Sequence, residues 1–165
     1  MPTEDEMRLH SCCFTGHRPE KLNEPEAIVC QKLEKEIRQA IADGFNVFIT
    51  GMSRGVDILA AEIVLRLRRE SQPIRLICAS PYRGFENRWS ADWQRRYNDV
   101  LAAADQISFI CSNYSPSCFQ IRNEWMVNHS ARVIAVYDGE LGGTKNTVDY
   151  ACRKGIAVRF ANQDT

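Results

Sequence analysis

The chain has 165 residues, the size of one ordinary domain. Its 21 Lys and Arg residues balance its 21 Asp and Glu residues, which excludes a uniformly basic nucleic-acid coat and a polybasic membrane binder. No run reaches the ~20 apolar residues of a membrane span, and residues 1–7 are acidic, the reverse of a signal peptide. We therefore expect a short tail over residues 1–8 and a single cytoplasmic domain over residues 9–161, with no membrane partner.

Short apolar runs alternate with helical patterns along the chain. The predicted strands are residues 9–14, 47–50, 74–79, 107–111, 133–137 and 156–160. Apolar stripes and end signals predict helices over about 23–43, 56–67, 92–104, 115–129 and 146–154. Ser115 and Pro116 are the predicted N-cap and first residue of the fourth helix. This alternation predicts an α/β fold, a Rossmann-like doubly wound, mostly parallel sheet of about six strands with helices on both faces.

Glycine-rich loops follow several predicted strands, at the sheet edge where open α/β folds bind ligands. They contain Gly16-His17-Arg18, Gly51-Met52-Ser53-Arg54-Gly55-Val56-Asp57 and Gly142-Gly143-Thr144. Glycines beside the start of a helix let backbone N–H groups approach an anion, and arginines add positive charge. Two such loops, with Arg18, Arg54 and Arg122 available, predict a phosphate-bearing ligand. The alternative is that the glycines serve only as tight turns.

Other chemistry has less support in the sequence. Neither GxxxxGK[ST] nor an initial GxGxxG is present, and no His, Cys, Asp or Glu cluster has metal-ligand spacing. We therefore expect no metal and no cofactor. His17 either contacts the ligand or packs within its loop. The aromatic residues at every fourth position from Phe85 to Tyr97 favour packing on the sheet over base stacking, with Trp89 and Tyr82 as the two rings expected to reach a ligand.

The loops resemble a known superfamily. Residues 51–57, followed by Ala60 and Ala61, resemble the G-x-[AS]-R-G-[IV]-D…A motif of the DprA/Smf DNA-processing proteins. The stretch from Arg122 to Gly142-Gly143-Thr144 resembles the LOG nucleoside-monophosphate phosphoribohydrolases. Together they resemble the SLOG (Smf/DprA–LOG) superfamily, and Thr15-Gly16-His17-Arg18-Pro19 with Lys21-Leu22 resembles its YpsA/YoqJ-like branch. The likeness spans about residues 9–160.

Three functions follow from this resemblance. The first is binding of a nucleotide or nucleotide-derived ligand, with ligand-binding residues predicted at Gly16, His17, Arg18, Gly51, Ser53, Arg54, Gly55, Tyr82, Gly142, Gly143, Thr144 and Thr147. The second is LOG-like hydrolysis of an N-glycosidic bond. Arg122 is kept, but Thr147 replaces the catalytic Glu, so Asp57 or Asp138 would have to supply the carboxylate. The third is DprA-like binding of single-stranded nucleic acid. Analogy with the superfamily also implies a homodimer.

Overall fold

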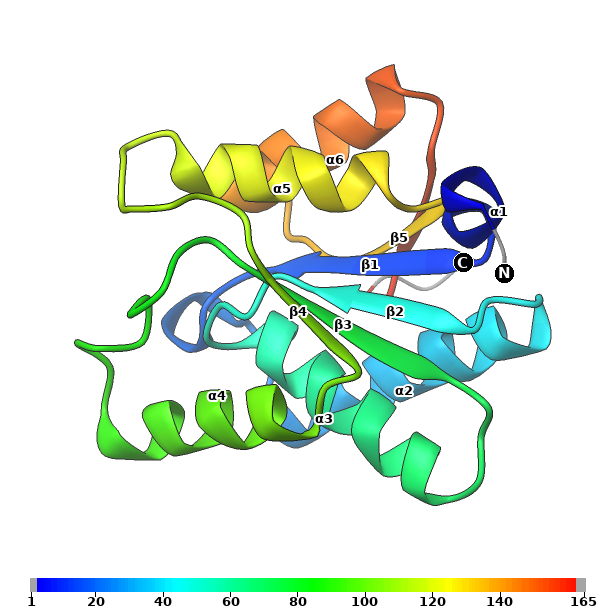
Figure 1. The fold of residues 1–165 in the computed structure, drawn as a ribbon, viewed down its shortest axis with the longest axis horizontal. Coiled ribbons are helices and arrows are strands. Elements are labelled where there is room, and N and C mark those ends of the chain that lie inside the picture. The colour runs from blue at the N-terminus through cyan, green and yellow to red at the C-terminus, as the bar shows by residue number, and fades with distance from the viewer. Residues whose placement is uncertain (1–2, 163–165) are drawn as a thin grey trace.

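The computed structural model describes residues 3–162, and its centre is one six-stranded sheet (Figure 1). The strand order is β4-β3-β2-β1-β5-β6, and every neighbouring pair is parallel. The strands are β1 (Ser11–Gly16), β2 (Val47–Thr50), β3 (Arg75–Ser80), β4 (Gln106–Phe109), β5 (Arg132–Val136) and β6 (Ala157–Phe160). The predicted Rossmann-like α/β fold is confirmed, and the sheet is parallel throughout.

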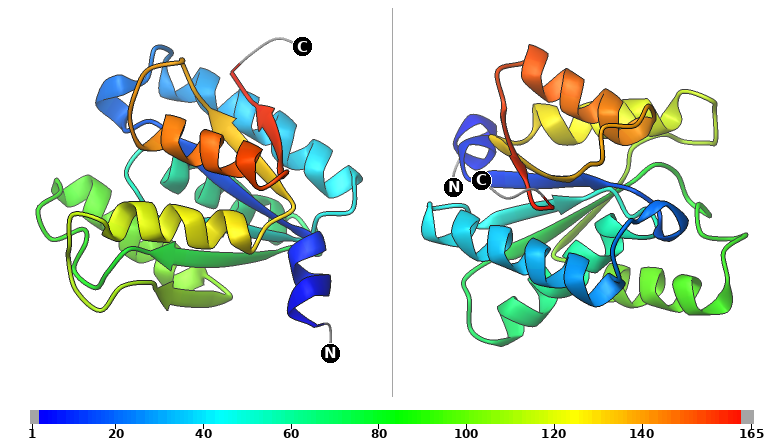
Figure 2. Two further views of the ribbon diagram at one scale, coloured as in Figure 1. Left: turned by 90° about the horizontal axis from the view of Figure 1, so that it is seen from above. Right: turned by 180° about the vertical axis from the view of Figure 1, so that it is seen from behind.

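Helices cover both faces of the sheet, as Figures 1 and 2 show. The helices are α1 (Glu4–Leu9), the 3-10 turn η1 (Pro19–Lys21), α2 (Glu26–Ala42), α3 (Val56–Arg69), α4 (Ala91–Ala103), α5 (Cys118–Asn128) and α6 (Gly143–Arg153). Helices α2, α3 and α4 pack on one face, and α5 and α6 pack on the other. The chain builds outward from β1 to β4, and α5 then carries it back so that β5 lies on the free side of β1. The strand order therefore reverses between β1 and β5, where open α/β sheets form a ligand crevice.

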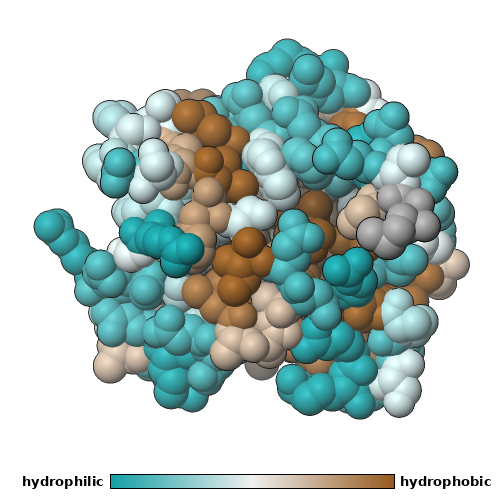
Figure 3. Space-filling model, in the orientation of Figure 1, coloured by the Kyte–Doolittle hydropathy of each residue, from teal (hydrophilic) through white to brown (hydrophobic). Residues whose placement is uncertain are grey.

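The strands are apolar because both sheet faces are buried. Successive residues of β1 point to opposite faces, so Cys12 and Phe14 join one core and Cys13 joins the other. Phe14 stacks on Phe48 of β2 with ring centroids 6.0 Å apart. Apolar side chains reach the surface over α5 and β4 (Figure 3), where Ile121 and Ile107 are exposed.

The start of the chain differs from the prediction. Residues 4–9 form α1, so Leu9 belongs to a helix rather than to the first strand and is 55% exposed. The cause is a capping box: the Thr3 hydroxyl accepts a hydrogen bond from the Glu6 N–H, and the Glu6 carboxylate accepts one from the Thr3 N–H. The predicted first strand therefore began too early, and the predicted tail contains a helical turn.

Two other helix starts were placed wrongly. Helix α5 begins at Cys118, and Ser115 lies in the turn before it, where its carbonyl accepts the Cys118 N–H. The N-cap is Ser117, which makes no side-chain capping bond. Helix α6 begins at Gly143 rather than at Asn146, so Thr144 lies in its first turn. The second shift matters for function, because it places the Gly142-Gly143-Thr144 segment directly at a helix N-terminus.

Candidate functional site

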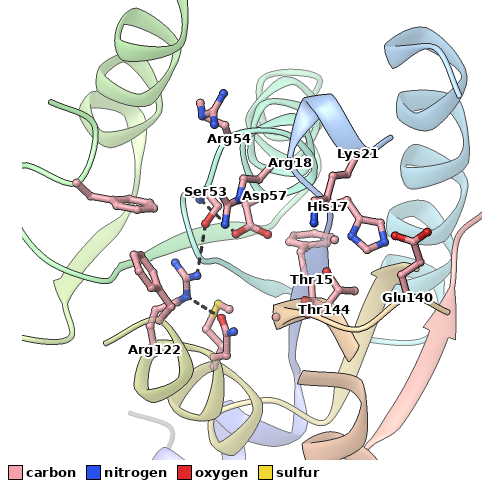
Figure 4. A pocket seen from close by; sticks show the side chains of 18 of the residues that line it. Thr15, His17, Arg18, Lys21, Ser53, Arg54, Asp57, Arg122, Glu140 and Thr144 are labelled. Carbon is pink, nitrogen blue, oxygen red and sulfur yellow. Dashed lines mark hydrogen bonds between the residues drawn. The ribbon is translucent and has the colours of Figure 1, made fainter. Parts of the chain in front are cut away.

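A cavity of about 480 Å³ opens at the carboxyl ends of β1, β2 and β5, at the point where the strand order reverses (Figure 4). Its size lies within the range of small-molecule sites. Four connections, those after β1, β2, β3 and β5, supply its walls together with helix α5. The lining residues are Phe14, Thr15, Gly16, His17, Arg18, Lys21, Ser53, Arg54, Asp57, Phe85, Trp89, Phe119, Arg122, Asn123, Met126, Glu140, Leu141, Gly142, Gly143 and Thr144.

The loop between β2 and α3 is tightly fixed. Gly55, the N-cap of α3, has φ +90°, and a Cβ there would lie 2.5 Å from the His17 carbonyl oxygen. Met52 is fully buried although its φ is +66°. The Thr50 hydroxyl donates to the Asp57 carbonyl at 2.8 Å and accepts from the Met52 N–H at 3.3 Å. This bonding holds an unfavourable backbone in place and sets Ser53 and Asp57 at the cavity wall.

Arg122 is the buried cation of the site, with 5% of its surface exposed. Its Nη1 donates to the Gly51 carbonyl, its Nε to the Asn123 Oδ1 at 2.8 Å, and its Nη2 to the Ser53 hydroxyl at 3.4 Å. Gly51 has to be small, because a Cβ there would lie 2.9 Å from the Asp57 carboxylate and 3.1 Å from the guanidinium carbon of Arg122. Helix α5 and the β2–α3 loop therefore fit together around a guanidinium that faces the cavity.

Asp57 is the buried carboxylate of the site. Its Oδ2 accepts the Ser53 N–H at 3.2 Å. Burial raises the pKa of the Asp57 carboxyl to about 6, against the opposing effects of the Arg122 charge and the Ser53 N–H. Among residues 3–162, no salt bridge joins Asp57 to a basic side chain. An incompletely compensated carboxylate in a cleft is a candidate for ligand contact or proton transfer.

Further positive charge comes from the connection after β1 and from the β2–α3 loop. Arg18 and Lys21 point toward the cavity in Figure 4. Arg54 pairs with Glu20 at 3.2 Å, and its guanidinium lies 6.0 Å from the centre of the Trp89 ring. These side chains line the same cavity as Arg122, so the site favours an anion.

The connection from β5 to α6 is held differently. The Asp138 Oδ1 accepts the Glu140 N–H at 3.0 Å and lies 3.0 Å from the His17 Nε2. The Glu140 N–H and the adjacent His17 lower the pKa of the Asp138 carboxyl. Beyond this anchor, Leu141 is 84% exposed although it lines the cavity. Gly142 has φ +143° and directly precedes α6.

The structure gathers most of the predicted site residues around the cavity and leaves some outside it. Those that line it are Gly16, His17, Arg18, Ser53, Arg54, Asp57, Arg122, Gly142, Gly143 and Thr144. Gly51 and Gly55 shape the loop behind the wall. Asp138 lines a small neighbouring hollow, and Tyr82 adjoins the cavity's aromatic residues without lining it. Thr147 is fully buried, and its hydroxyl donates to the Gly143 carbonyl at 2.9 Å.

Several lining residues were absent from the sequence-based set, notably Lys21, Phe119, Asn123 and Glu140. Helical spacing would have found two of them. Phe119 precedes Arg122 by three positions and therefore shares its helix face. Asn123 follows Phe119 by four positions, and its Oδ1 accepts a hydrogen bond from the Arg122 Nε. Lys21 belongs to the segment that carries the family likeness, but nothing local indicates where its side chain points.

Residues 3–162 contain no group of three or more His, Cys, Asp and Glu side chains placed to hold a metal ion. None of the helices in that range has the length and apolar character that crossing a bilayer requires.

Comparison with known proteins identifies relatives of this chain. The SPbeta prophage-derived protein YoqJ of Bacillus subtilis (strain 168) is 35% identical over 116 residues, which cover 63% of this chain and 68% of the relative. A UPF0398 protein of Bacillus cereus (strain B4264) is 29% identical over 150 residues, covering 86% of this chain and 82% of the relative.

A solved structure of DNA processing protein A from Helicobacter pylori, described for its single-stranded DNA binding mode, has the same fold. It superposes with a TM-score of 0.64 at 18% identity, over 92% of this chain. This chain spans 64% of that protein's length. The family model of the YspA SLOG family (YpsA) matches residues 12–159. The chain therefore belongs to the YspA SLOG family.

Proposed function

We propose that the cavity binds a nucleotide or nucleotide-derived ligand and holds its phosphate with the loops at the carboxyl edge of the sheet. The observation that carries the proposal is the convergence of cations. Arg18, Lys21, Arg54 and Arg122 line one cavity, against the two carboxylates of Asp57 and Glu140. The N-terminal ends of α3 and α6 adjoin the same cavity, and helix N-termini favour bound anions.

The cavity wall also suits the other parts of a nucleotide. Phe85, Trp89 and Phe119 supply an aromatic side for a base. Asp57 supplies a carboxylate that accepts hydrogen bonds from sugar hydroxyls. Since an unpaired carboxylate repels phosphate, the ligand must place a donor at Asp57 and its phosphate nearer to Arg122.

A thermal-shift panel with AMP, ADP-ribose and NAD tests the proposal, with adenosine as the ligand that lacks phosphate. A ligand at about 100 times its Kd adds about 2.7 kcal/mol, or roughly 5–10 °C for a chain of this size. The double variant Arg18→Ala/Arg54→Ala should lose most of that shift. Arg75→Ala is the matched control, because Arg75 is exposed at the start of β3 and outside the cavity lining. Equal shifts for AMP and adenosine would contradict phosphate recognition.

Hydrolysis of the ligand has weaker support. Thr147, at the position of the LOG-type Glu, is buried and engaged with the Gly143 carbonyl, outside the cavity. Asp57 is then the buried carboxylate left to act on an N-glycosidic bond. The nucleotides that shift the melting temperature are the ones to incubate with the protein, with release of free base as the readout. Release that Asp57→Asn abolishes would make the chain a phosphoribohydrolase.

A second candidate function is binding of single-stranded nucleic acid. The fold shared with the DNA processing protein from Helicobacter pylori favours it, as do the aromatic rings beside the cationic wall. Balanced overall charge weighs against a long phosphate track. Titration of a fluorescent oligodeoxyadenylate at several salt concentrations separates the two functions. Backbone binding requires affinity to fall by about 0.7 log units per phosphate contact for each tenfold rise in salt. If the affinity for the oligonucleotide falls with salt no more steeply than the affinity for AMP, the nucleotide pocket is favoured.

A further inference from the structure

The aromatic side of the cavity continues beyond it. Phe85 and Phe119 line the cavity, and their ring centroids are 5.6 Å apart. Tyr82 lies 5.6 Å from Phe85 and 6.4 Å from Phe119. Tyr114, in the connection from β4 to α5, lies 5.8 Å from Tyr82 and 6.2 Å from Phe119. Tyr82 and Tyr114 do not line the cavity, and we call this pair the outer platform.

Within the outer platform, Tyr82 is half-buried, whereas Tyr114 is exposed and yet held in place. Tyr114 is 62% exposed, the only aromatic side chain among the exposed large apolar residues of residues 3–162. An exposed ring gains little free energy from the hydrophobic effect, so burial does not explain the position of Tyr114. Its contacts with Tyr82 and Phe119 are edge-to-face, with interplanar angles of 78° and 63°. Such contacts orient rings, and the low conformational entropy of tyrosine makes an oriented ring a ready-made binding surface.

Positive charge accompanies the outer platform. Arg83 and Arg88 are exposed in the same β3–α4 connection that carries Tyr82. The Arg83 guanidinium stacks over Phe109 of β4 at 4.2 Å. Basic side chains in the same connection as a platform ring suit a ligand in which a second base follows a linking phosphate.

We propose that the outer platform of Tyr82 and Tyr114 is a second base-stacking site, so that the preferred ligand carries two bases joined by phosphate. This inference rests on the proposed function, because the first nucleotide occupies the cationic cavity. Two classes of ligand share this chemistry: a dinucleotide and the end of a single-stranded oligonucleotide. In either case the first base contacts the cavity wall and the second contacts the ring of Tyr114.

Calorimetric titration with AMP, with the 5′-phosphorylated dinucleotide pApA and with a short 5′-phosphorylated oligoadenylate tests the inference. The dinucleotide should bind about tenfold more tightly than AMP, the gain expected of one base–aromatic stack. Tyr114→Leu should remove that gain and leave AMP affinity unchanged, whereas Tyr114→Phe should keep the gain. Leu9→Ala is the matched control, because Leu9 is similarly exposed. It belongs to α1, which lies at the amino ends of the strands, far from the site (Figure 1).

The outcomes separate the two proposals. Equal affinity for AMP and pApA, or a gain that survives Tyr114→Leu, overturns the outer platform and leaves the nucleotide cavity standing. If neither pApA nor any nucleotide of the thermal-shift panel binds, the proposed function is overturned and this inference with it. If pApA and the oligoadenylate bind equally, the inference holds for a dinucleotide. If the oligoadenylate binds more tightly and Tyr114→Leu weakens it, the inference holds for a strand end.

Discussion

The two glycine-containing loops at the cavity are built in opposite ways. In the β2–α3 loop, added Cβ atoms at Gly51 and Gly55 would meet neighbouring atoms at 2.9 and 2.5 Å. In the β5–α6 loop, Cβ atoms at Gly139, Gly142 and Gly143 would meet nothing within 4 Å. The first loop is a packed wall around Arg122 and Asp57. The second is attached through Asp138 and is otherwise open, so the same residue type serves close approach in one loop and backbone freedom in the other.

The largest expected effect is in the packed loop. Gly55→Ala would require a φ that L-residues avoid and would push a methyl group against the His17 carbonyl. We expect a loss of about 3 kcal/mol or more in the free energy of unfolding. Urea denaturation followed by circular dichroism measures it. A loss below about 1 kcal/mol would show that the loop relaxes easily and is not a rigid wall.

The next effect concerns Asp57 and depends on pH. Because burial raises the pKa of Asp57 from 3.8 to about 6, the native state binds a proton more tightly than the unfolded state. Stability contributed by this group is greatest below about pH 4 and falls as the pH rises through 6. Above pH 6 the ionised Asp57 carboxylate lowers the free energy of unfolding by about 3 kcal/mol.

Asp57→Asn removes that titration and should raise the free energy of unfolding at pH 7 by up to about 3 kcal/mol, since an amide oxygen still accepts the Ser53 N–H. Denaturation measured at several pH values between about 4 and 7 gives the slope of the free energy of unfolding against pH, and this slope should be smaller in the variant. Glu140→Gln, at an exposed carboxylate of the other loop, is the control and should leave the slope unchanged. An unchanged slope in Asp57→Asn would contradict the burial of an incompletely compensated carboxylate.

The contrast between the loops also shows which features of the fold and the site can be predicted from the sequence. Apolar runs and stripes predicted the strands and the two helical layers, because burial on both sheet faces leaves a continuous apolar signal. Glycines beside Arg54 and Thr144 predicted the position of both loops. The bond from Arg122 to the Gly51 carbonyl joins residues far apart in the chain, so no local pattern predicts it. The start of α5 shows the converse, since the helix begins at Cys118, beyond the local Ser115–Pro116 signal.

A smaller effect is expected where the open loop is attached. Asp138→Asn weakens the contact with His17 and with the Glu140 N–H, so the loop should open more often while the fold stays intact. Hydrogen exchange of the amides in residues 139–142 should become faster, with little change in melting temperature. Asp149→Asn, which breaks the half-buried pair with Lys145 on α6, is the control and should leave those amides unaffected. Unchanged exchange in Asp138→Asn would mean that Asp138 does not anchor the loop.

The smallest effect is expected at Gly143, where the two loops can be compared by the same substitution. Gly143 begins α6 without a positive φ, and a methyl group there would enter open space. Gly143→Ala should therefore be neutral or stabilise the fold by about 0.5 kcal/mol through the unfolded chain. If the cavity holds phosphate against this helix start, the same methyl group should weaken AMP binding while stability is kept. Equal losses of stability in Gly143→Ala and Gly55→Ala would mean that the open loop is as tightly packed as the closed one.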